Sequence, residues 1–170
     1  MRRIVIVGCP GSGKSTLARA LGARLGLPVI HLDALFWGPS WTPGATKDFR
    51  AKVAEAVAGE AWVCDGGYSS TYDLRLPRVD LVIWLDRPWW LCLWRVLVRW
   101  LTHIGRTRAD MAPDCPEKVD GEFVLYIWNW RRRNRPELQA ALAQFAPEVP
   151  LRVLRSDRQT DRFLATLPSG

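Results

Sequence analysis

One short segment near the start of the chain holds the residue types that can grip a row of phosphates. Residues 8–15 read GCPGSGKS and fit the spacing G-x-x-x-x-G-K-S/T of a phosphate-binding loop, or P-loop. Glycines let backbone N–H groups approach crowded anionic oxygens, a lysine can reach β- and γ-phosphates, and a hydroxyl can hold Mg²⁺. The motif therefore predicts a nucleotide site at Gly8, Gly11, Ser12, Gly13, Lys14, Ser15 and Thr16, in which Lys14 is catalytic and Ser15 is a metal ligand.

The residues on either side of this motif must form the elements that position it. Residues 3–7 are a short apolar, β-branched run, which is typical of a buried strand. After the motif, Leu17, Leu21 and Leu25 recur every four residues, which predicts a helix with an apolar stripe. A strand, a glycine-rich loop and a helix N-terminus are the context that phosphate binding needs.

Two later apolar runs end in aspartates, Asp33 after residues 27–32 and Asp65 after residues 61–64. The C-terminal ends of parallel strands meet at one sheet edge, where ligands bind. Asp33 is a candidate to orient an acceptor, accept its hydroxyl proton or contact Mg²⁺ through water, with a cap or turn as the alternative. Asp65 is a candidate to support Mg²⁺, and Gly66 allows the backbone to approach a ligand closely.

Three more side chains are candidates to contact the acceptor. Residues 36–44 are rich in Pro and Gly, which predicts a stretch without regular structure. In it, Trp37 could stack on a ring of the acceptor or pack on the core. Arg50, on a helix predicted over residues 45–58, could reach an acceptor phosphate or lie on a solvated face. Arg75 follows in a short helical turn.

A strand over residues 79–86 precedes a helix predicted over residues 88–104. On this helix a core face is expected at Leu91, Trp94, Val98 and Leu101. Arg95, Arg99 and Arg106 fall nearly on one line, so Arg99 and Arg106 are candidates to stabilise charge during phosphoryl transfer, with a solvated stripe as the alternative. Residues 105–117 are polar and contain Pro, which predicts a mobile lid.

The rest of the chain predicts an aromatic-rich helix over residues 119–134, a break at Pro136, a helix over 137–145, a strand over 151–154 and a last helix over 157–167. Five strands alternating with helices indicate a three-layer α/β fold with a parallel sheet. No linker or repeat divides residues 1–170, so one domain is expected.

The bulk composition suits an anionic ligand. Among 170 residues, 24 Lys and Arg face 17 Asp and Glu, which gives a net charge of +7. The four cysteines lack C-x-x-C spacing, so reduced thiols and a cytoplasmic location are expected rather than a metal site. The apolar stretch 89–101 is too short for a membrane span and contains two arginines.

These motifs together resemble the small bacterial adenylate-kinase-like P-loop proteins, some of which are labelled DNA topology modulation protein. The shared features are the loop at 8–15, HLD at 31–33 followed by Trp, DGGY at 65–68, the strand ending at 86, the segment 106–118, the Trp-rich helix and DRFL at 161–164. The resemblance implies the nucleoside-monophosphate-kinase type of P-loop fold, with a five-stranded parallel sheet, a short acceptor-binding insert at 34–60 and an arginine lid at 105–117.

The resemblance also carries roles to single residues. It implies that Asp33 lies near the acceptor, as the matching carboxylate does in shikimate kinase. Asp65 and Gly66 match the start of the D-G-x-P-R motif of adenylate kinases, whose arginine grips the acceptor phosphate. This chain departs from the motif, because Tyr68 and Ser69 stand where Pro and Arg would be, so Arg75 or Arg50 would have to replace that arginine.

Two functions are consistent with these features. The first is a phosphotransferase that moves the γ-phosphoryl group of Mg·ATP to a nucleoside monophosphate or a small hydroxyl compound. The second is an ATP-binding regulator that acts on or near DNA through arginines such as those at 131–135. The first is favoured, because phosphoryl transfer needs mainly positioning and charge, and the chain has no recognisable element that reads DNA.

Overall fold

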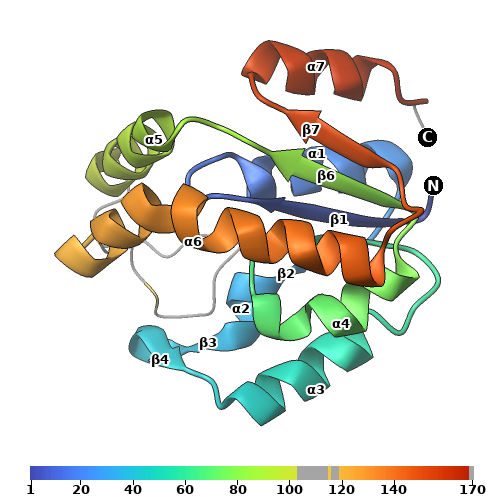
Figure 1. Ribbon diagram of the computed structural model, residues 1–170, viewed down its shortest axis with the longest axis horizontal. Coiled ribbons are helices and arrows are strands. Elements are labelled where there is room, and N and C mark those ends of the chain that lie inside the picture. Colours follow the sequence, from blue (N-terminus) through green and yellow to red (C-terminus); the bar gives the residue numbers. More distant parts are fainter. Residues whose placement is uncertain (103–114, 116–118, 169–170) are drawn as a thin grey trace.

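The computed structural model describes residues 1–102, 115 and 119–168 (Figure 1). The lid predicted at 105–117, including Arg106, therefore lies outside the described residues except for Cys115. All four cysteines are buried and none forms a disulfide. Among the described helices, none has the length and apolar character needed to cross a membrane.

The centre of the fold is a five-stranded parallel sheet in the order β2-β5-β1-β6-β7. Its strands are β1 (Arg3–Gly8), β2 (Val29–His31), β5 (Trp62–Asp65), β6 (Leu81–Leu85) and β7 (Leu151–Leu154). Every residue of β5 and β6 is buried, as expected for strands that are covered by helices on both faces. The predicted three-layer α/β fold is thus confirmed.

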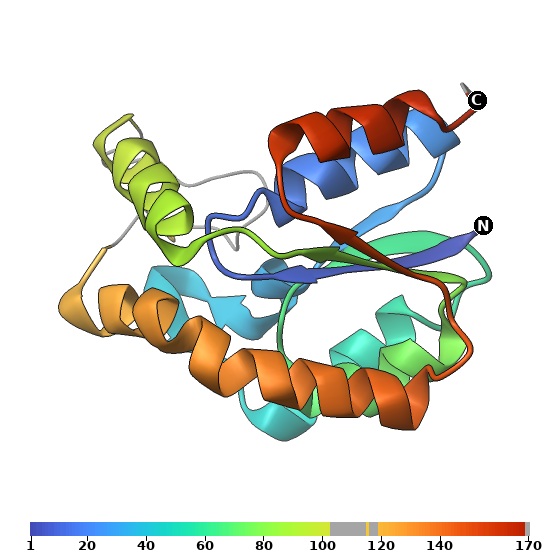
Figure 2. The same ribbon diagram turned by 45° about the horizontal axis from the view of Figure 1, so that its top comes forward.

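Two helical layers cover this sheet (Figures 1 and 2). Helices α1 (Lys14–Leu25) and α7 (Asp157–Ala165) lie on one face, and α3 (Thr46–Ala56), α4 (Tyr72–Arg75) and α6 (Gly121–Phe145) lie on the other. Successive side chains of β1 point to opposite faces of the sheet. Ile4 and Ile6 pack with Leu17 of α1, whereas Val5 and Val7 belong to the core cluster on the α6 side. Burial on both faces holds β1 at the middle of the molecule.

Helix α5 (Trp89–Thr102) lies at the end of the sheet, beside the loop at 8–15 (Figure 1). The core face predicted for it is wrong: Trp94 is 63% exposed and Leu101 is 61% exposed, and Cys92 and Val96 are buried instead. The reason is tertiary. The helix lies beside the loop and α6 rather than across a sheet face, so Cys92 and Val96 are buried against these neighbours while Trp94 and Leu101 remain exposed.

Helix α6 continues through Pro136, so the break predicted there is wrong. A proline inside a helix removes one backbone hydrogen bond and costs about 3 kcal/mol. Here Ile127 and Trp130 before it and Leu138 and Ala141 after it are buried in the same core cluster. Burial of both halves against one surface offsets the local cost and keeps the helix in one piece.

The chain between β2 and β5 also differs from expectation. Strand β2 ends at His31, and Asp33 lies in the first turn of the short helix α2 (Leu32–Phe36) rather than at a strand end. Residues 37–43 form a small hairpin of β3 (Trp37–Gly38) and β4 (Thr42–Pro43) around the 3-10 turn η1 (Pro39–Trp41). Beyond β5, the 3-10 turns η2 (Ser69–Thr71) and η3 (Leu76–Arg78) flank α4.

One carboxylate ties the first strand to the start of β6. Asp80 accepts hydrogen bonds from the backbone N–H groups of Arg2 and Arg3, at 2.7 and 3.0 Å, and from the Arg3 guanidinium at 3.0 Å. Partial burial acts to raise the pKa of Asp80, but these donors outweigh it and lower the pKa to about 2. The ionised carboxylate therefore stabilises the fold.

We expect Asp80→Asn to lower the free energy of unfolding at pH 7 by about 1 kcal/mol, a value reduced for the partial exposure of the pair. A depressed pKa stabilises the fold above the unfolded-state pKa near 4 and loses this effect as the pH falls toward 2. Urea unfolding at several pH values should show the wild-type and variant curves converging at low pH. A difference that stays constant from pH 7 to pH 2 would contradict this account.

Candidate active site

The predicted P-loop joins β1 to α1, and its backbone leaves no room for side chains at two glycines. A Cβ at Gly11 would lie 2.3 Å from the Cys92 carbonyl oxygen, and one at Gly8 would lie 2.6 Å from the Leu85 carbonyl oxygen. Gly11 and Gly13 also have φ angles of 78° and 96°, which L side chains rarely adopt. The loop is thus shaped by its packing against β6 and α5 as well as by its own sequence.

The loop presents donors toward the space where phosphates would bind. Helix α1 begins at Lys14 with Gly13 as its N-cap, without a side-chain cap or an acidic residue in its first turn. Its first N–H groups and its positive dipole end are therefore left for an anion. Lys14 Nζ donates to the Cys9 carbonyl at 2.9 Å, and the buried Ser12 hydroxyl has no hydrogen-bond partner within the described part of the chain. These groups fit a polyphosphate.

The residues predicted to hold Mg²⁺ lie in direct contact. Ser15 Oγ donates to Asp65 Oδ2 at 2.7 Å, and Asp65 is only 4% exposed. A hydroxyl and a carboxylate are the hard oxygen donors that Mg²⁺ uses together with phosphate oxygens and water. No cluster of three or more His, Cys, Asp or Glu among residues 1–102, 115 and 119–168 could hold a metal alone. A metal at this pair would therefore depend on nucleotide oxygens.

A histidine completes this group, and the sequence reasoning missed its role. His31 Nδ1 lies 2.5 Å from Asp65 Oδ1, because β2 and β5 pair in a register that sets His31 beside Asp65. The signal available in the sequence was the HLD tripeptide, in which only the aspartate was assigned a function. Strand pairing between residues 34 positions apart could not be read from it.

Asp33 lies just beyond this group, at the same sheet edge. The Tyr68 hydroxyl donates to Asp33 Oδ1 at 2.6 Å. Burial, and then the neighbouring Asp33 charge, raise the pKa of Tyr68 well above its usual value, so it stays a donor. The tyrosine that replaces the proline of the adenylate kinase motif thus orients the candidate acceptor-binding carboxylate.

The aromatic residues next to Asp33 form a packed cluster. Trp37 meets Phe36 and Trp41 edge-on, with ring centroids 4.9 and 5.3 Å apart. Stacking of Trp37 on an acceptor stays a prediction, since these contacts account for its position without one.

Gly66, with a φ of 141°, lets the Leu32 side chain approach its backbone.

The two arginines assigned to an acceptor phosphate have other partners. Arg75 is fully buried and donates to the carbonyls of Gly66 and Gly67, at 3.0 and 2.6 Å, and these bonds do not favour the predicted contact with an acceptor, which stays a prediction. Its guanidinium instead braces the loop that follows Asp65. Both terminal nitrogens of the Arg50 guanidinium donate to the Asp73 carboxylate, at 2.9 and 2.7 Å.

The predicted line of arginines is only partly within the described structure. Arg99 lies in the last turn of α5, and Arg106 lies outside the described residues. Arg95, one turn before Arg99, is the member near the loop: its Nη1 is 4.0 Å from where a Cβ on Gly13 would lie. Asp157 at the start of α7 holds Arg95 at 2.5 Å and Arg87 at 3.1 Å.

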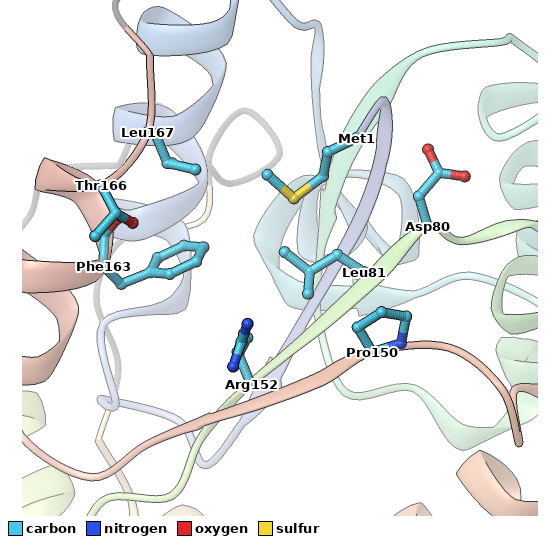
Figure 3. Close-up of a pocket in the computed structure, with 8 residues that line it drawn as sticks. All are labelled: Met1, Asp80, Leu81, Pro150, Arg152, Phe163, Thr166 and Leu167. Atoms are coloured by element: carbon cyan, nitrogen blue, oxygen red, sulfur yellow. The ribbon is translucent and has the colours of Figure 1, made fainter.

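A hollow of about 410 Å³ lies away from all of these groups (Figure 3). It is lined by the chain start, the beginnings of β6 and β7 and the last helix, through residues such as Met1, Leu81, Arg152 and Phe163. Asp80 on its rim is already bonded to Arg2 and Arg3. Ligands of parallel sheets bind at the C-terminal strand edge, so we assign the site to the P-loop edge.

No family model matches the chain. Curated relatives match parts of it: 36% identity over 83 residues with the uncharacterized protein YfjP of Escherichia coli, covering 48% of this chain and 29% of that protein. A shikimate kinase of Paramagnetospirillum magneticum is 42% identical over 59 residues, covering 35% and 29%, and one of Symbiobacterium thermophilum is 33% identical over 98 residues, covering 49% and 56%. The matches thus span less than two thirds of each relative's length.

Solved structures match nearly the whole chain. A sugar kinase from Janibacter has a TM-score of 0.52 at 18% identity, covering 97% of this chain and 93% of that one. A shikimate kinase from Acinetobacter baumannii, solved with shikimate, has a TM-score of 0.59 at 17% identity, covering 96% and 91%. The chain has the fold of these P-loop kinases. None of these relatives bears a DNA-related name, so the DNA topology label gains no support.

Gly11→Ala should weaken nucleotide binding at the P-loop, because its methyl group would collide with the Cys92 carbonyl and oppose the backbone angle. We expect the affinity for a fluorescent ATP analogue to fall at least about tenfold. Gly59→Ala is the matched control, since nothing lies within 4 Å of that position and its φ is ordinary. Equal binding by both variants would show that the loop tolerates a side chain.

Proposed function

We propose that the protein is an ATP-dependent kinase that phosphorylates a hydroxyl group of a small molecule. One observation carries the proposal: the Ser15–Asp65 pair beneath the P-loop and the Asp33–Tyr68 pair occupy the same sheet edge. A phosphate-binding group and a fixed carboxylate for an acceptor are therefore neighbours. The fold shared with a sugar kinase and a shikimate kinase is consistent with this proposal.

Each residue has a role that follows from its chemistry. The loop N–H groups and Lys14 bind the phosphates and stabilise their charge. Ser15 and Asp65 would hold Mg²⁺, which neutralises charge on the phosphates when it is bound. Asp33 accepts a hydrogen bond from the acceptor hydroxyl and takes its proton, and Tyr68 keeps this carboxylate oriented.

The acceptor is more consistent with a small hydroxyl compound than with a nucleoside monophosphate. The arginine of the adenylate kinase motif is replaced by Ser69. Both proposed substitutes already have other partners, since Arg75 is buried among carbonyls and Arg50 is paired with Asp73. The alternative of a DNA-directed regulator rests only on basic side chains such as the exposed arginines 131–133 of α6, which are not by themselves an element that reads DNA.

ADP formation from Mg·ATP should be stimulated by one acceptor class in a panel of shikimate, gluconate, neutral sugars, polyols, nucleosides and nucleoside monophosphates. Lys14→Ala removes the amine that faces the phosphates and should lower the stimulated rate at least about 100-fold. Stimulation only by nucleoside monophosphates would replace the proposed acceptor class. ATP binding without stimulation by any acceptor would contradict the kinase proposal across these classes.

Asp33→Asn should separate catalysis from nucleotide binding. The amide cannot take the acceptor proton, so kcat should fall about 100-fold or more, whereas the affinity for ATP should stay within about twofold because Asp33 does not contact the P-loop pair in the described bonds. Asp73→Asn, which changes the carboxylate paired with Arg50, serves as a control. Equal loss in both variants would remove Asp33 from the catalytic group.

A further inference from the structure

His31 links the second strand to the carboxylate beneath the P-loop. It is the last residue of β2, and its partner in the sheet register is Asp65 of β5. Its Nδ1 lies 2.5 Å from Asp65 Oδ1, and both side chains are shielded, at 16% and 5% exposure. The contact is therefore a largely shielded interaction between the side chains of adjacent strands.

The two oxygens of Asp65 have different donors. A carboxylate only accepts hydrogen bonds, so His31 must carry a proton on Nδ1 and donate it to Oδ1. Ser15 donates its hydroxyl hydrogen to Oδ2 at 2.7 Å. Once that hydrogen points at Asp65, the lone pairs of Ser15 Oγ are left for a cation.

We propose that His31 is a positioning residue that holds the Asp65 carboxylate, and through it the Ser15 hydroxyl, in the orientation that receives Mg²⁺ with the nucleotide. This inference rests on the proposed nucleotide site and extends it to a residue that does not touch the metal. Outer partners of metal ligands commonly change metal affinity 10- to 100-fold when they are removed. His31 meets the requirement for such a partner because it fixes one carboxylate oxygen while leaving the second to Ser15.

Burial explains why a donor is needed at this position. Asp65 is 4% exposed, so water has little access to Oδ1, and a buried carboxylate oxygen without a donor is costly. If His31 is removed, the carboxylate can regain a donor only by turning, which breaks its alignment with Ser15. The consequence should be a weaker Mg²⁺ site in a loop that still binds phosphates through its N–H groups and Lys14.

The test measures ADP binding by calorimetry with Mg²⁺ and with EDTA, in the wild type and in two His31 variants. The measured quantity is the ratio of the Kd in EDTA to the Kd in Mg²⁺. His31→Leu removes the donor, and we expect this ratio to fall about tenfold while the Kd in EDTA stays within about twofold. His31→Asn should keep most of the ratio, because its amide nitrogen can occupy the place of Nδ1.

Two further variants keep the test decisive. Tyr68→Phe removes the neighbouring donor to Asp33 and leaves Asp65 untouched, so its ratio should match the wild type. His31→Gln carries its amide one bond farther from the backbone, so its ratio should fall as in His31→Leu. If His31→Leu does not fold, the comparison of His31→Asn with His31→Gln replaces it. Thermal unfolding checks the fold of each protein.

Several results would overturn the proposal. They are an unchanged ratio in His31→Leu, an equal loss of affinity in EDTA and in Mg²⁺, or a wild type whose ADP binding does not depend on Mg²⁺. The kinase proposal fails separately, when no acceptor stimulates ADP formation, and the binding ratio can still be measured in that case. A loss of catalysis with an intact ratio would point to His31 as a base instead of a positioning residue.

Discussion

The close packing of the P-loop backbone against β6 and α5 is the constraint on which the rest of the site depends. At Gly8 and Gly11 the neighbouring carbonyls lie so near that no Cβ fits. This contact sets the direction of the N–H groups at the start of α1, and it also explains the place of α5. Cys92 and Val96 are buried because they face the loop, while Trp94 and Leu101 remain exposed on the other side of that helix.

Register between strands brings the remaining groups to the loop. Pairing of His31 with Asp65 places two strand ends beside Ser15, and the turns that follow them place Asp33 beside Tyr68. Two pairs of side chains therefore share one sheet edge. Ser15 and Asp65 lie next to the phosphate-binding loop, and Asp33 and Tyr68 lie in the turns that follow β2 and β5. This is the arrangement that transfer between a nucleotide and a separate acceptor requires.

The buried arginines of the described structure bond to other parts of the protein. Arg75 satisfies carbonyls in the loop after β5, and Arg87 shares Asp157 with Arg95 at the start of α7. A net charge of +7 is therefore not a measure of how many arginines face a ligand. The partners of each arginine show whether it stabilises the fold or is left to bind a ligand, and those partners can lie far away in the sequence.

The P-loop, the buried strands and the α/β class could be predicted from the amino-acid sequence, because these depend on local spacing and on continuous apolar runs. It also determined that Ser15 and Asp65 belong to one site, since both follow strands that end at a common edge. The support of Asp65 by His31 follows from the register of β2 and β5, and the contacts of Tyr68 with Asp33 and of Arg75 with its carbonyls follow from how the turns after these strands pack; none of these could be read from local spacing. The same holds for α5 and for Pro136, where the surface available for packing outweighed the local pattern.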